Sequence, residues 1–347
     1  MNPHLFAYCL DWHINQSRAF YDLLVDPLQS FADVELVEWD GRSGDPLGNW
    51  TKRVAAEPTI FCQRPPSPEL FDIPGARLVW IPMWDNVAQN WSSDPWWGSL
   101  PKNLRVVAFS DWVARKSEAA GLPTLRLRYY ENPAEFDIVK WENRRTLFYW
   151  NRTGLFGPAF LRKLCSVLDV HQLYFRGKVD PKITPRAAYR LPARLGNTIV
   201  QEVSEFRTQS EYFDLLRCCN IFLAPRALEG VGLTFLEAMA SGCAVLAYDA
   251  PTMNEYITHG LNGYIFPAGA LGPGRMSFLQ QAKDTYDGWK TGKQIVYPVQ
   301  ISDQQDWKQL EKIDLEMLGS AARAGEESGF RQWKDQIPGY ARFILDW

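Results

Sequence analysis

The sequence predicts an α/β protein with two doubly wound parallel-sheet domains of Rossmann-like type. The first observation is length, because 347 residues exceed what one ordinary hydrophobic core accommodates. The second is that short apolar runs alternate with helical segments along most of the chain, which is typical of parallel sheets. The third is a polar, charged stretch, ENPAEFDIVKWENRR (131–145), that interrupts this alternation. We therefore place an N-terminal domain at 1–135, a linker at 136–145 and a C-terminal domain at 146–330.

The expected N-terminal strands are β-branched or otherwise apolar runs. They are LFAYCL (5–10), DVELVEW (33–39), TIFCQ (59–63), RLVWIPM (77–83), LRVVAFS (104–110) and TLRLRYY (124–130). Helical spacing is found between strands, as in SRAFYDLLVDPLQSF and DWVARKSEAAGL. In the first of these helices Pro27 interrupts the pattern, since proline has no backbone N–H to donate.

The second half repeats the alternation. Its expected strands are TLFYWN (146–151), HQLYFRG (171–177), NTIVQEV (197–203), NIFLAP (220–225), CAVLAYD (243–249) and NGYIFP (262–267). Residues 268–305 are irregular and rich in Gly, Pro, Asp and Gln, so we interpret them as an insertion or loop. The end of the chain is helical with a break expected at Pro338, and the helix at 331–347 is expected to return to the N-terminal domain.

Composition excludes several classes of protein. Hydrophobic residues make up 46% and charged residues 22%, values typical of a folded globular protein. The net charge of -3 provides no basic surface for nucleic acid. No apolar run reaches the roughly 20 residues that span a bilayer, and the N-terminus lacks the features of a signal peptide. The six cysteines form no CxxC motif, so we expect reduced thiols and a cytoplasmic protein.

The stretch PRALEGVGLTFLEAMASGCAVLAYD (225–249) predicts a ligand site. Glu229 and two glycines follow an expected strand, and a helix is expected to begin near Gly232–Thr234. Free N–H groups and the helix dipole favour an anion such as a diphosphate at that end. Ligands of doubly wound sheets bind outside the carboxyl ends of the strands, so Glu229 can face the ligand there. Glu237, one turn into the helix, can accept hydrogen bonds from a ribose diol.

Ordinary structural roles stay open for both glutamates. Thr234-x-x-Glu237 also matches a capping box, in which Glu237 only satisfies a backbone N–H. Thr252-x-x-Glu255 matches the same pattern. Glu229 has no such role, but a glutamate on a loop is usually solvated.

Residues 218–267, CCNIFLAPRALEGVGLTFLEAMASGCAVLAYDAPTMNEYITHGLNGYIFP, closely resemble the nucleotide-sugar-binding half of GT-B-fold retaining glycosyltransferases. This large family, glycosyltransferase group 1 or family 4-like, has two glutamates separated by seven residues. A weaker resemblance to the same family covers most of the chain. The resemblance implies two domains facing across a cleft, with Glu229 near the reacting sugar and Glu237 at the ribose. It also implies transfer with retained configuration and without a metal, and the sequence has no D-x-D or HExxH motif. The implied donor-binding residues are Gly230, Gly232, Leu233, Thr234, Glu237, Lys178 and Arg207.

The chain departs from the family where two cations neutralise the leaving diphosphate. In NRTGLFG, Arg152 matches the family arginine, whereas Phe156 stands about where a lysine is expected. Losing a cation there should slow transfer, because negative charge develops on the leaving group. Lys178 and Arg226 are candidates to replace this lysine. Each could instead be an ordinary surface cation, and we favour that interpretation for Lys178. The expected catalytic set is thus Glu229, Arg152 and Arg226, and base recognition is expected near Ser204–Arg207.

The acceptor side also departs from the family pattern. His13, in LDWHINQS, stands where relatives commonly have a glycine pair. Trp84 and Asp85, in MWDN, stand where many relatives have a His-Asp pair. Asp85 can orient an acceptor hydroxyl or cap the following helix. The segment WDNVAQNWSSDPWWG (84–98) carries four indoles, which suit a sugar-stacking platform, a membrane-interface patch or core packing.

The function expected from these residues is retaining transfer of a sugar in polysaccharide biosynthesis. The donor is a nucleotide-diphosphate sugar, the acceptor a glycan or lipid-linked glycan, and no cofactor is expected. A peripheral contact with the inner face of the membrane stays open, as does the oligomeric state. Two alternatives remain: a nucleotide-sugar epimerase or phosphorylase of the same fold, and a catalytically degenerate glycan-binding or partner subunit.

Overall fold

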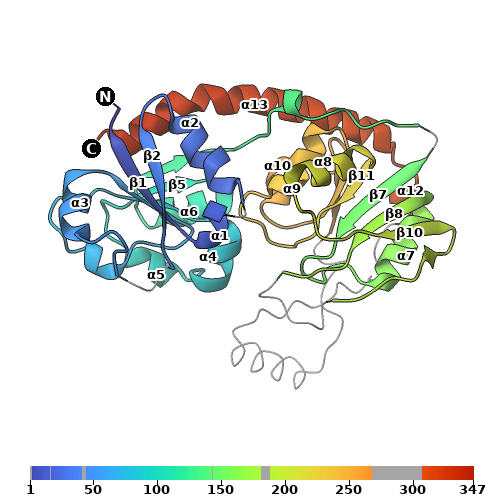
Figure 1. The fold of residues 1–347 in the computed structure, drawn as a ribbon, viewed down its shortest axis with the longest axis horizontal. Helices are drawn as coiled ribbons and strands as arrows, with labels where there is room; N and C mark the ends of the chain where they lie inside the picture. The colour runs from blue at the N-terminus through green and yellow to red at the C-terminus, as the bar shows by residue number, and fades with distance from the viewer. Residues whose placement is uncertain (1, 16, 41–43, 143, 181–187, 268–306) are drawn as a thin grey trace, which may run out of the picture. The chain divides into compact units, whose positions relative to one another are not determined.

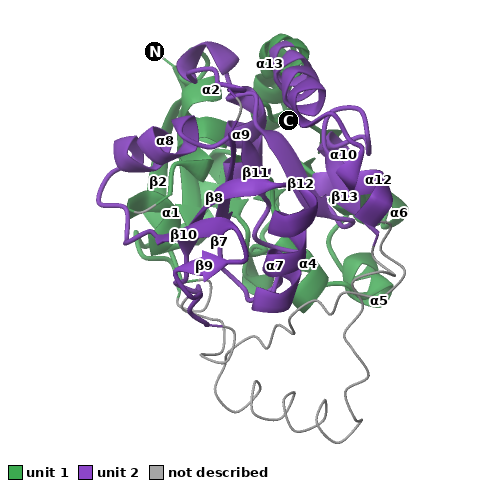
Figure 2. Cartoon of the chain, turned by 90° about the vertical axis from the view of Figure 1, so that its right-hand side faces the viewer, with its two compact units in different colours: residues 1–130, 228–233, 328–347 green, residues 131–227, 234–327 purple. Residues whose placement is uncertain are grey.

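A computed structural model describes residues 2–15, 17–40, 44–142, 144–180, 188–267 and 307–347. The chain forms two compact units (Figure 2). Unit 1 contains Met1–Tyr130, Leu228–Leu233 and Ser328–Trp347, and unit 2 contains Glu131–Ala227 and Thr234–Glu327. The loop that carries Glu229 therefore groups with the N-terminal residues, although the sequence placed it in the C-terminal domain. The insertion expected at 268–305 lies outside the described residues.

Unit 1 is built on a six-stranded parallel sheet with the order β2-β1-β3-β4-β5-β6. Figure 1 labels its strands β1, β2 and β5. Its strands are β1 (His4–Cys9), β2 (Asp33–Glu38), β3 (Thr59–Cys62), β4 (Leu78–Ile81), β5 (Arg105–Ala108) and β6 (Thr124–Arg126). Each overlaps one of the six apolar runs, so the predicted parallel sheet is confirmed. The middle strands β3 and β4 are buried along their whole length, as expected for a sheet covered on both faces.

Short helices connect these strands. They are α1 (Asp11–Asn15), the π-helix η1 (Tyr21–Val25), α2 (Asp26–Leu28), α3 (Trp50–Ala56), the 3₁₀ turn η2 (Pro68–Leu70), α4 (Trp84–Asn90), α5 (Asp94–Gly98) and α6 (Asp111–Ala119). Pro27 lies in the first turn of α2, directly after the π-helix, where its missing N–H is tolerated. The interruption predicted at Pro27 is thus a change of helix type.

Unit 2 contains a seven-stranded sheet with the order β13-β12-β11-β7-β8-β10-β9. All neighbouring strands are parallel except the short edge strand β9, which is antiparallel to β10. The strands are β7 (Arg145–Trp150), β8 (Val170–Arg176), β9 (Arg194–Leu195), β10 (Thr198–Glu202), β11 (Ile221–Leu223), β12 (Ala244–Tyr248) and β13 (Tyr264–Phe266). The first strand of the unit, β7, lies between β8 and β11. The strand order reverses at β7, and this reversal is the place where doubly wound sheets bind ligands.

The helices of unit 2 begin with the 3₁₀ turn η3 (Pro133–Glu135) and continue with α7 (Pro158–Val167), α8 (Gln209–Arg217), α9 (Leu233–Ala240), α10 (Met253–Tyr256) and α12 (Trp307–Glu311). The long helix α13 (Leu315–Leu345) contributes residues to both units. The break predicted at Pro338 is wrong, because α13 continues through it. Proline has no N–H to donate to the carbonyl of Lys334, four residues earlier in the helix. Both residues are exposed, so water can bond to that carbonyl instead.

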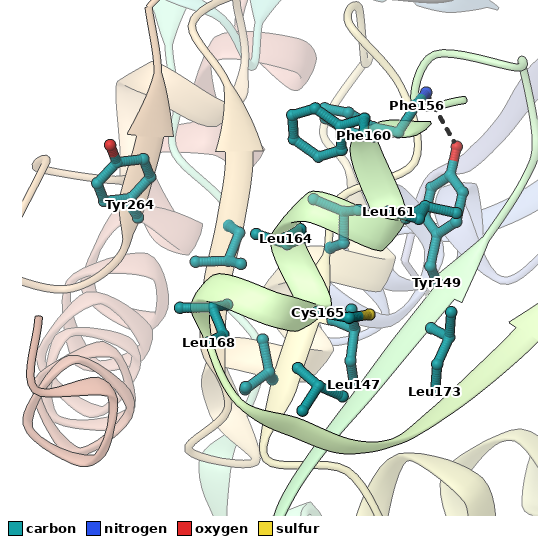
Figure 3. Close-up of a cluster of buried hydrophobic side chains, with 14 of the residues drawn as sticks. Leu147, Tyr149, Phe156, Phe160, Leu161, Leu164, Cys165, Leu168, Leu173 and Tyr264 are labelled. Atoms are coloured by element: carbon teal, nitrogen blue, oxygen red, sulfur yellow. Dashed lines mark hydrogen bonds between the residues drawn. The ribbon is translucent and has the colours of Figure 1, made fainter. Parts of the chain in front are cut away.

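The core of unit 2 fills the space between its sheet and α7. Leu161, Leu164 and Cys165 point from α7 toward β7 and β8 (Figure 3). Phe156 lies at the start of this helix with its ring fully buried, 4.6 Å from the ring centroid of Phe160. Its backbone N–H donates to the hydroxyl of Tyr149 at 3.3 Å (Figure 3). The loop after β7 is therefore anchored to the core by an aromatic side chain.

Within the described residues, no helix combines the length and apolar character needed to cross a bilayer. All six cysteines are free thiols, and five of them are buried while Cys218 is exposed.

Candidate functional site

Two of the predicted cations meet at the carboxyl edge of the unit 2 sheet. Arg152 follows β7 and Arg226 follows β11, so the pair flanks the point where the strand order reverses. Both bind one carboxylate, Asp180, which lies in the loop after β8. Nε of Arg152 donates to Oδ1 of Asp180 at 3.1 Å. Arg226 donates to Oδ2 through a terminal nitrogen at 2.6 Å and through Nε at 3.2 Å.

Backbone hydrogen bonds fix the three loops of this cluster. The N–H of Asp180 donates to the carbonyl of Arg152 at 2.8 Å. The hydroxyl of Thr153 donates to the carbonyl of Pro225 at 3.0 Å, which joins the loop after β7 to the loop after β11. Burial by itself would raise the pKa of Asp180, but the charges and hydrogen bonds of the two arginines outweigh it, so the pKa is lowered. Asp180 is therefore ionised at neutral pH, and two guanidinium groups share one negative charge.

A third guanidinium, which the sequence reasoning missed, lies beside this cluster. Arg176 ends β8 and is only 6% exposed. Its guanidinium carbon is 4.1 Å from the ring centroid of Trp150 and 4.8 Å from that of Phe206. Arg152 also contacts Trp150, at 5.0 Å from the ring centroid. Three arginines and one aspartate thus give this edge a net positive charge.

The other candidate replacement cation lies apart from the cluster. Lys178 pairs with Glu205 at 2.5 Å, and both side chains are more than half exposed. This geometry supports the interpretation of Lys178 as a surface cation. Phe156, where the family lysine was expected, is a fully buried core residue. Of the two candidate cations, Arg226 is the one that the structure brings next to Arg152, on the shared carboxylate of Asp180.

Neither structural alternative considered for the glycine-rich loop and α9, a solvated Glu229 and a capping box at Thr234, is found. Glu229 is only 6% exposed, so it is not a solvated loop glutamate. Gly232 has φ of +85°, a conformation that glycine adopts without the steric penalty of a Cβ. The helix α9 begins at Leu233, which makes Thr234 its second residue. The capping box proposed for Thr234 is therefore wrong, because an N-cap residue must precede the helix.

The second box lacks the hydrogen bond expected from its threonine side chain. Thr252 occupies the N-cap position of α10, but its side chain makes no capping hydrogen bond.

Glu237 lies in a buried polar contact within unit 2. It is 8% exposed, and its charge lies close to Tyr212, which comes from α8. The Tyr212 hydroxyl lies 3.5 Å from the carbonyl of Thr234. Burial, followed by the Glu237 charge, raises the pKa of Tyr212 well above its ordinary value. A neutral tyrosine hydroxyl thus lies beside Glu237 in the second turn of α9, which the sequence did not indicate.

In unit 1, Gly230 packs against the residue that precedes α4. A Cβ at Gly230 would lie 3.0 Å from Cβ of Met83, so this close approach favours glycine. Trp84 begins α4, and its ring stacks on Trp112 with centroids 5.6 Å apart. Asp85 is the second residue of α4 and Met83 is its N-cap, so the capping role considered for Asp85 is wrong.

Two further predicted residues make local contacts. His13 lies in α1, and its ring packs edge-on against Phe20 with centroids 5.0 Å apart. Arg207 is exposed, and its backbone N–H donates to the Glu211 carboxylate at 2.8 Å, just before α8.

The other indoles of the Trp-rich segment belong to the core of unit 1. Trp97 is 1% exposed and packs on Trp80, with centroids 5.3 Å apart. Trp91 and Trp96 are partly buried and pack against the same cluster. Core packing therefore accounts for these three tryptophans of the segment, and Trp84 is the one whose ring pairs with an exposed neighbour, Trp112.

The described residues contain no group of three or more His, Cys, Asp or Glu side chains arranged to hold a metal ion.

Comparisons with known proteins found similar sequences and similar folds. Residues 190–271 match the family model for glycosyl transferases group 1. A segment of 47 residues is 47% identical to a lipopolysaccharide core biosynthesis mannosyltransferase, LpsB of Rhizobium meliloti strain 1021. That segment covers 14% of this chain and 13% of that protein.

Solved structures resemble the chain over almost its whole length. A glycosyltransferase from Rickettsia africae is 15% identical with a TM-score of 0.60, and the match covers 99% of each chain. HepE of Anabaena, solved with UDP and glucose, is 14% identical with a TM-score of 0.56, covering 98% of this chain and 99% of that one. The fold is thus the two-domain α/β fold of GT-B glycosyltransferases. Over residues 190–271 the chain resembles the glycosyl transferases of group 1.

Proposed function

We propose that this protein is a retaining glycosyltransferase that moves a sugar from a nucleotide-diphosphate sugar to a glycan or lipid-linked glycan acceptor without a divalent metal. The observation that carries the proposal is the pair Arg152 and Arg226, held together by Asp180 at the reversal of the unit 2 strand order. A diphosphate needs such a paired cation, because arginine binds phosphate oxygens with charge-assisted hydrogen bonds.

The cluster can stabilise a leaving diphosphate. Within the described residues, Arg152 spends only Nε on Asp180, so its two terminal nitrogens remain to donate to phosphate oxygens. Negative charge grows on the diphosphate as the glycosidic bond breaks, and donors fixed in advance stabilise that charge most in the transition state. Two guanidinium groups can supply this stabilisation in place of a metal ion.

The remaining donor contacts come from the loop and helix after β11. Gly232 to Thr234 present backbone N–H groups at the start of α9, where the helix dipole favours a phosphate or a sugar hydroxyl. Glu237, which lies beside Tyr212, would accept hydrogen bonds from the ribose diol. Glu229 would contact the donor sugar near its reacting carbon. The Anabaena relative solved with UDP and glucose supports a donor of this class.

The test is a transfer assay on the purified full chain with a panel of nucleotide-diphosphate sugars, with and without a chelator. We expect turnover with at least one donor, no loss on chelation, and a product whose anomeric configuration, read by NMR, matches the donor. Glu229→Gln should lower the rate at least about 100-fold, as removal of a single group from a preorganised site does. The matched control is Glu118→Gln, since Glu118 is an exposed residue of α6 that pairs with Arg126 in unit 1.

An inverted product would refute the retaining mechanism, and a rearranged or phosphorolysed donor would indicate the epimerase or phosphorylase alternative. Near-wild-type transfer by Glu229→Gln would remove Glu229 from the reaction.

A degenerate binding subunit is the second candidate, and one observation favours it. Phe156 fills the expected lysine position with a buried ring. Tight nucleotide-sugar binding without transfer or hydrolysis of any donor would support this candidate over an enzyme.

A further inference from the structure

Arg176 is a buried cation that the diphosphate site does not use. It is 6% exposed, and its Nε is fully buried with no hydrogen-bond partner among the described residues. The nearest acids act on it only through their charge: Asp180 is already bonded to Arg152 and Arg226, and Glu205 to Lys178. Burying a charged donor without an acceptor is costly, so this arrangement indicates a ligand that supplies one.

Aromatic rings contact the guanidinium of Arg176, and among the described residues no acceptor reaches its Nε. Its carbon lies 4.1 Å from the ring centroid of Trp150 and 4.8 Å from that of Phe206, which are cation–π contacts. The Trp150 indole is itself anchored by donating to the carbonyl of Lys178 at 3.1 Å. These contacts hold the plane of Arg176, and a hydrogen-bond acceptor must come from elsewhere.

Arg176 lies between the residues proposed to bind the diphosphate and the residue proposed to bind the ribose. On one side, Trp150 also contacts Arg152, which belongs to the diphosphate cluster. On the other side, Phe206 packs on Tyr212 with centroids 5.5 Å apart, and Tyr212 lies beside Glu237 at the proposed ribose position. A nucleobase extends from the ribose, so the surface formed by Arg176, Trp150 and Phe206 is where the base would lie.

We propose that Arg176 contacts the donor nucleobase and selects guanine or uracil, which carry a carbonyl oxygen at O6 or O4 where adenine and cytosine carry an exocyclic amine. Arginine has only donors. Guanine presents O6 and N7 as paired acceptors, and uracil presents carbonyl oxygens, as thymine does. Adenine and cytosine place an exocyclic amine at the corresponding position, where two donors would oppose each other. This inference rests on the proposed function, because it takes a nucleoside diphosphate as part of the donor.

Isothermal titration calorimetry of the full chain with GDP, UDP, ADP and CDP tests the inference. We expect GDP or UDP to bind about tenfold or more tightly than ADP and CDP, the discrimination of one good arginine–base contact. Arg176→Met should remove most of that preference and leave ADP and CDP binding within about twofold. Arg152→Met is the matched control, and it should weaken all four ligands by a similar factor.

Two results would overturn the inference while the proposed function stands: wild-type protein that binds all four diphosphates equally, or Arg176→Met weakening all four alike. Binding of none of the four would overturn both. If Arg176→Met fails to fold, Arg176→Lys serves instead, because lysine keeps the charge but lacks the planar fork. Loss of the base preference in Arg176→Lys supports the inference, and an unchanged preference contradicts it.

Discussion

The carboxyl edges of the two sheets differ in their chemistry. In unit 2 this edge carries Arg152, Arg176 and Arg226 around the single carboxylate of Asp180. In unit 1 the ends of β4 and β5 are followed by the stacked rings of Trp84 and Trp112. The same architecture thus presents a cationic surface in one unit and an aromatic surface in the other. Charge suits the anionic donor nucleotide, and flat apolar rings suit a neutral sugar.

The largest effect is expected when a cation is removed from the carboxyl edge of unit 2, which tests whether that edge binds the nucleotide. We predict that Arg152→Met and Arg226→Met each weaken nucleoside diphosphate binding by about 1.5–3 kcal/mol, the worth of a hydrogen bond to a charged group. Arg217→Met is the control, because Arg217 is an exposed arginine that pairs with Asp137 and Asp214 away from the cluster. Calorimetry measures the effect, and an equal loss in Arg217→Met would point to general electrostatics.

A glycine variant shows whether the donor edge also needs its backbone donors. Gly232 and Gly260 both have positive φ, +85° and +76°. Alanine at either position should cost about 1–2 kcal/mol of stability, because a Cβ is strained in the left-handed region. We predict that only Gly232→Ala also weakens nucleoside diphosphate binding. Thermal unfolding and calorimetry separate the two effects, and unchanged binding by Gly232→Ala would exclude the loop from the donor site.

The aromatic edge of unit 1 is tested by shortening one of its rings. Trp112 is 43% exposed, and Trp347 at the end of the chain is 41% exposed. We predict that Trp112→Ala raises KM for the acceptor by up to about tenfold, the worth of one aromatic contact, and leaves KM for the donor unchanged. Trp347→Ala should change neither value. A donor effect in Trp112→Ala would mean that the two edges do not divide the substrates as proposed.

The smallest expected effect is the pH dependence of Asp180. Its pKa is lowered in the folded chain, so its contribution to stability is present above the ordinary aspartate pKa of about 3.9 and is lost as pH falls through the folded value. We predict that wild type exceeds Asp180→Asn in Tm at pH 7 and 5, and that the difference shrinks below about pH 4. Thermal unfolding at several pH values measures this. A difference that does not vary with pH would show that Asp180 acts through packing.

The sequence was a good guide to elements and a partial guide to the site. Strands such as 77–83 were predictable because a β-branched, apolar run can only be buried in a sheet interior. The break at Pro338 was wrong because local helix rules neglect that an exposed carbonyl can bond to water. The capping box at Thr234 was wrong because the helix begins at Leu233, so Thr234 already lies inside it.

The residues missed by the sequence reasoning are those whose roles depend on distant partners. Asp180 lies 28 residues from Arg152 and 46 residues from Arg226, and no local pattern links the three. Arg176 looked like one more charged residue near the end of a strand. Its burial between Trp150 and Phe206 exists only because the ends of β7, β8 and β10 lie side by side.

By itself the sequence determined the order of strands and helices, and it determined the glycine loop before α9. These features depend on period and backbone conformation, which neighbouring residues set. Only the tertiary structure decided that Glu229 is buried, that Lys178 is a surface residue, and that Arg226 joins Arg152 on one carboxylate. The physical reason is that parallel strands joined by crossovers bring loops together by sheet order, and sheet order is a property of the whole fold.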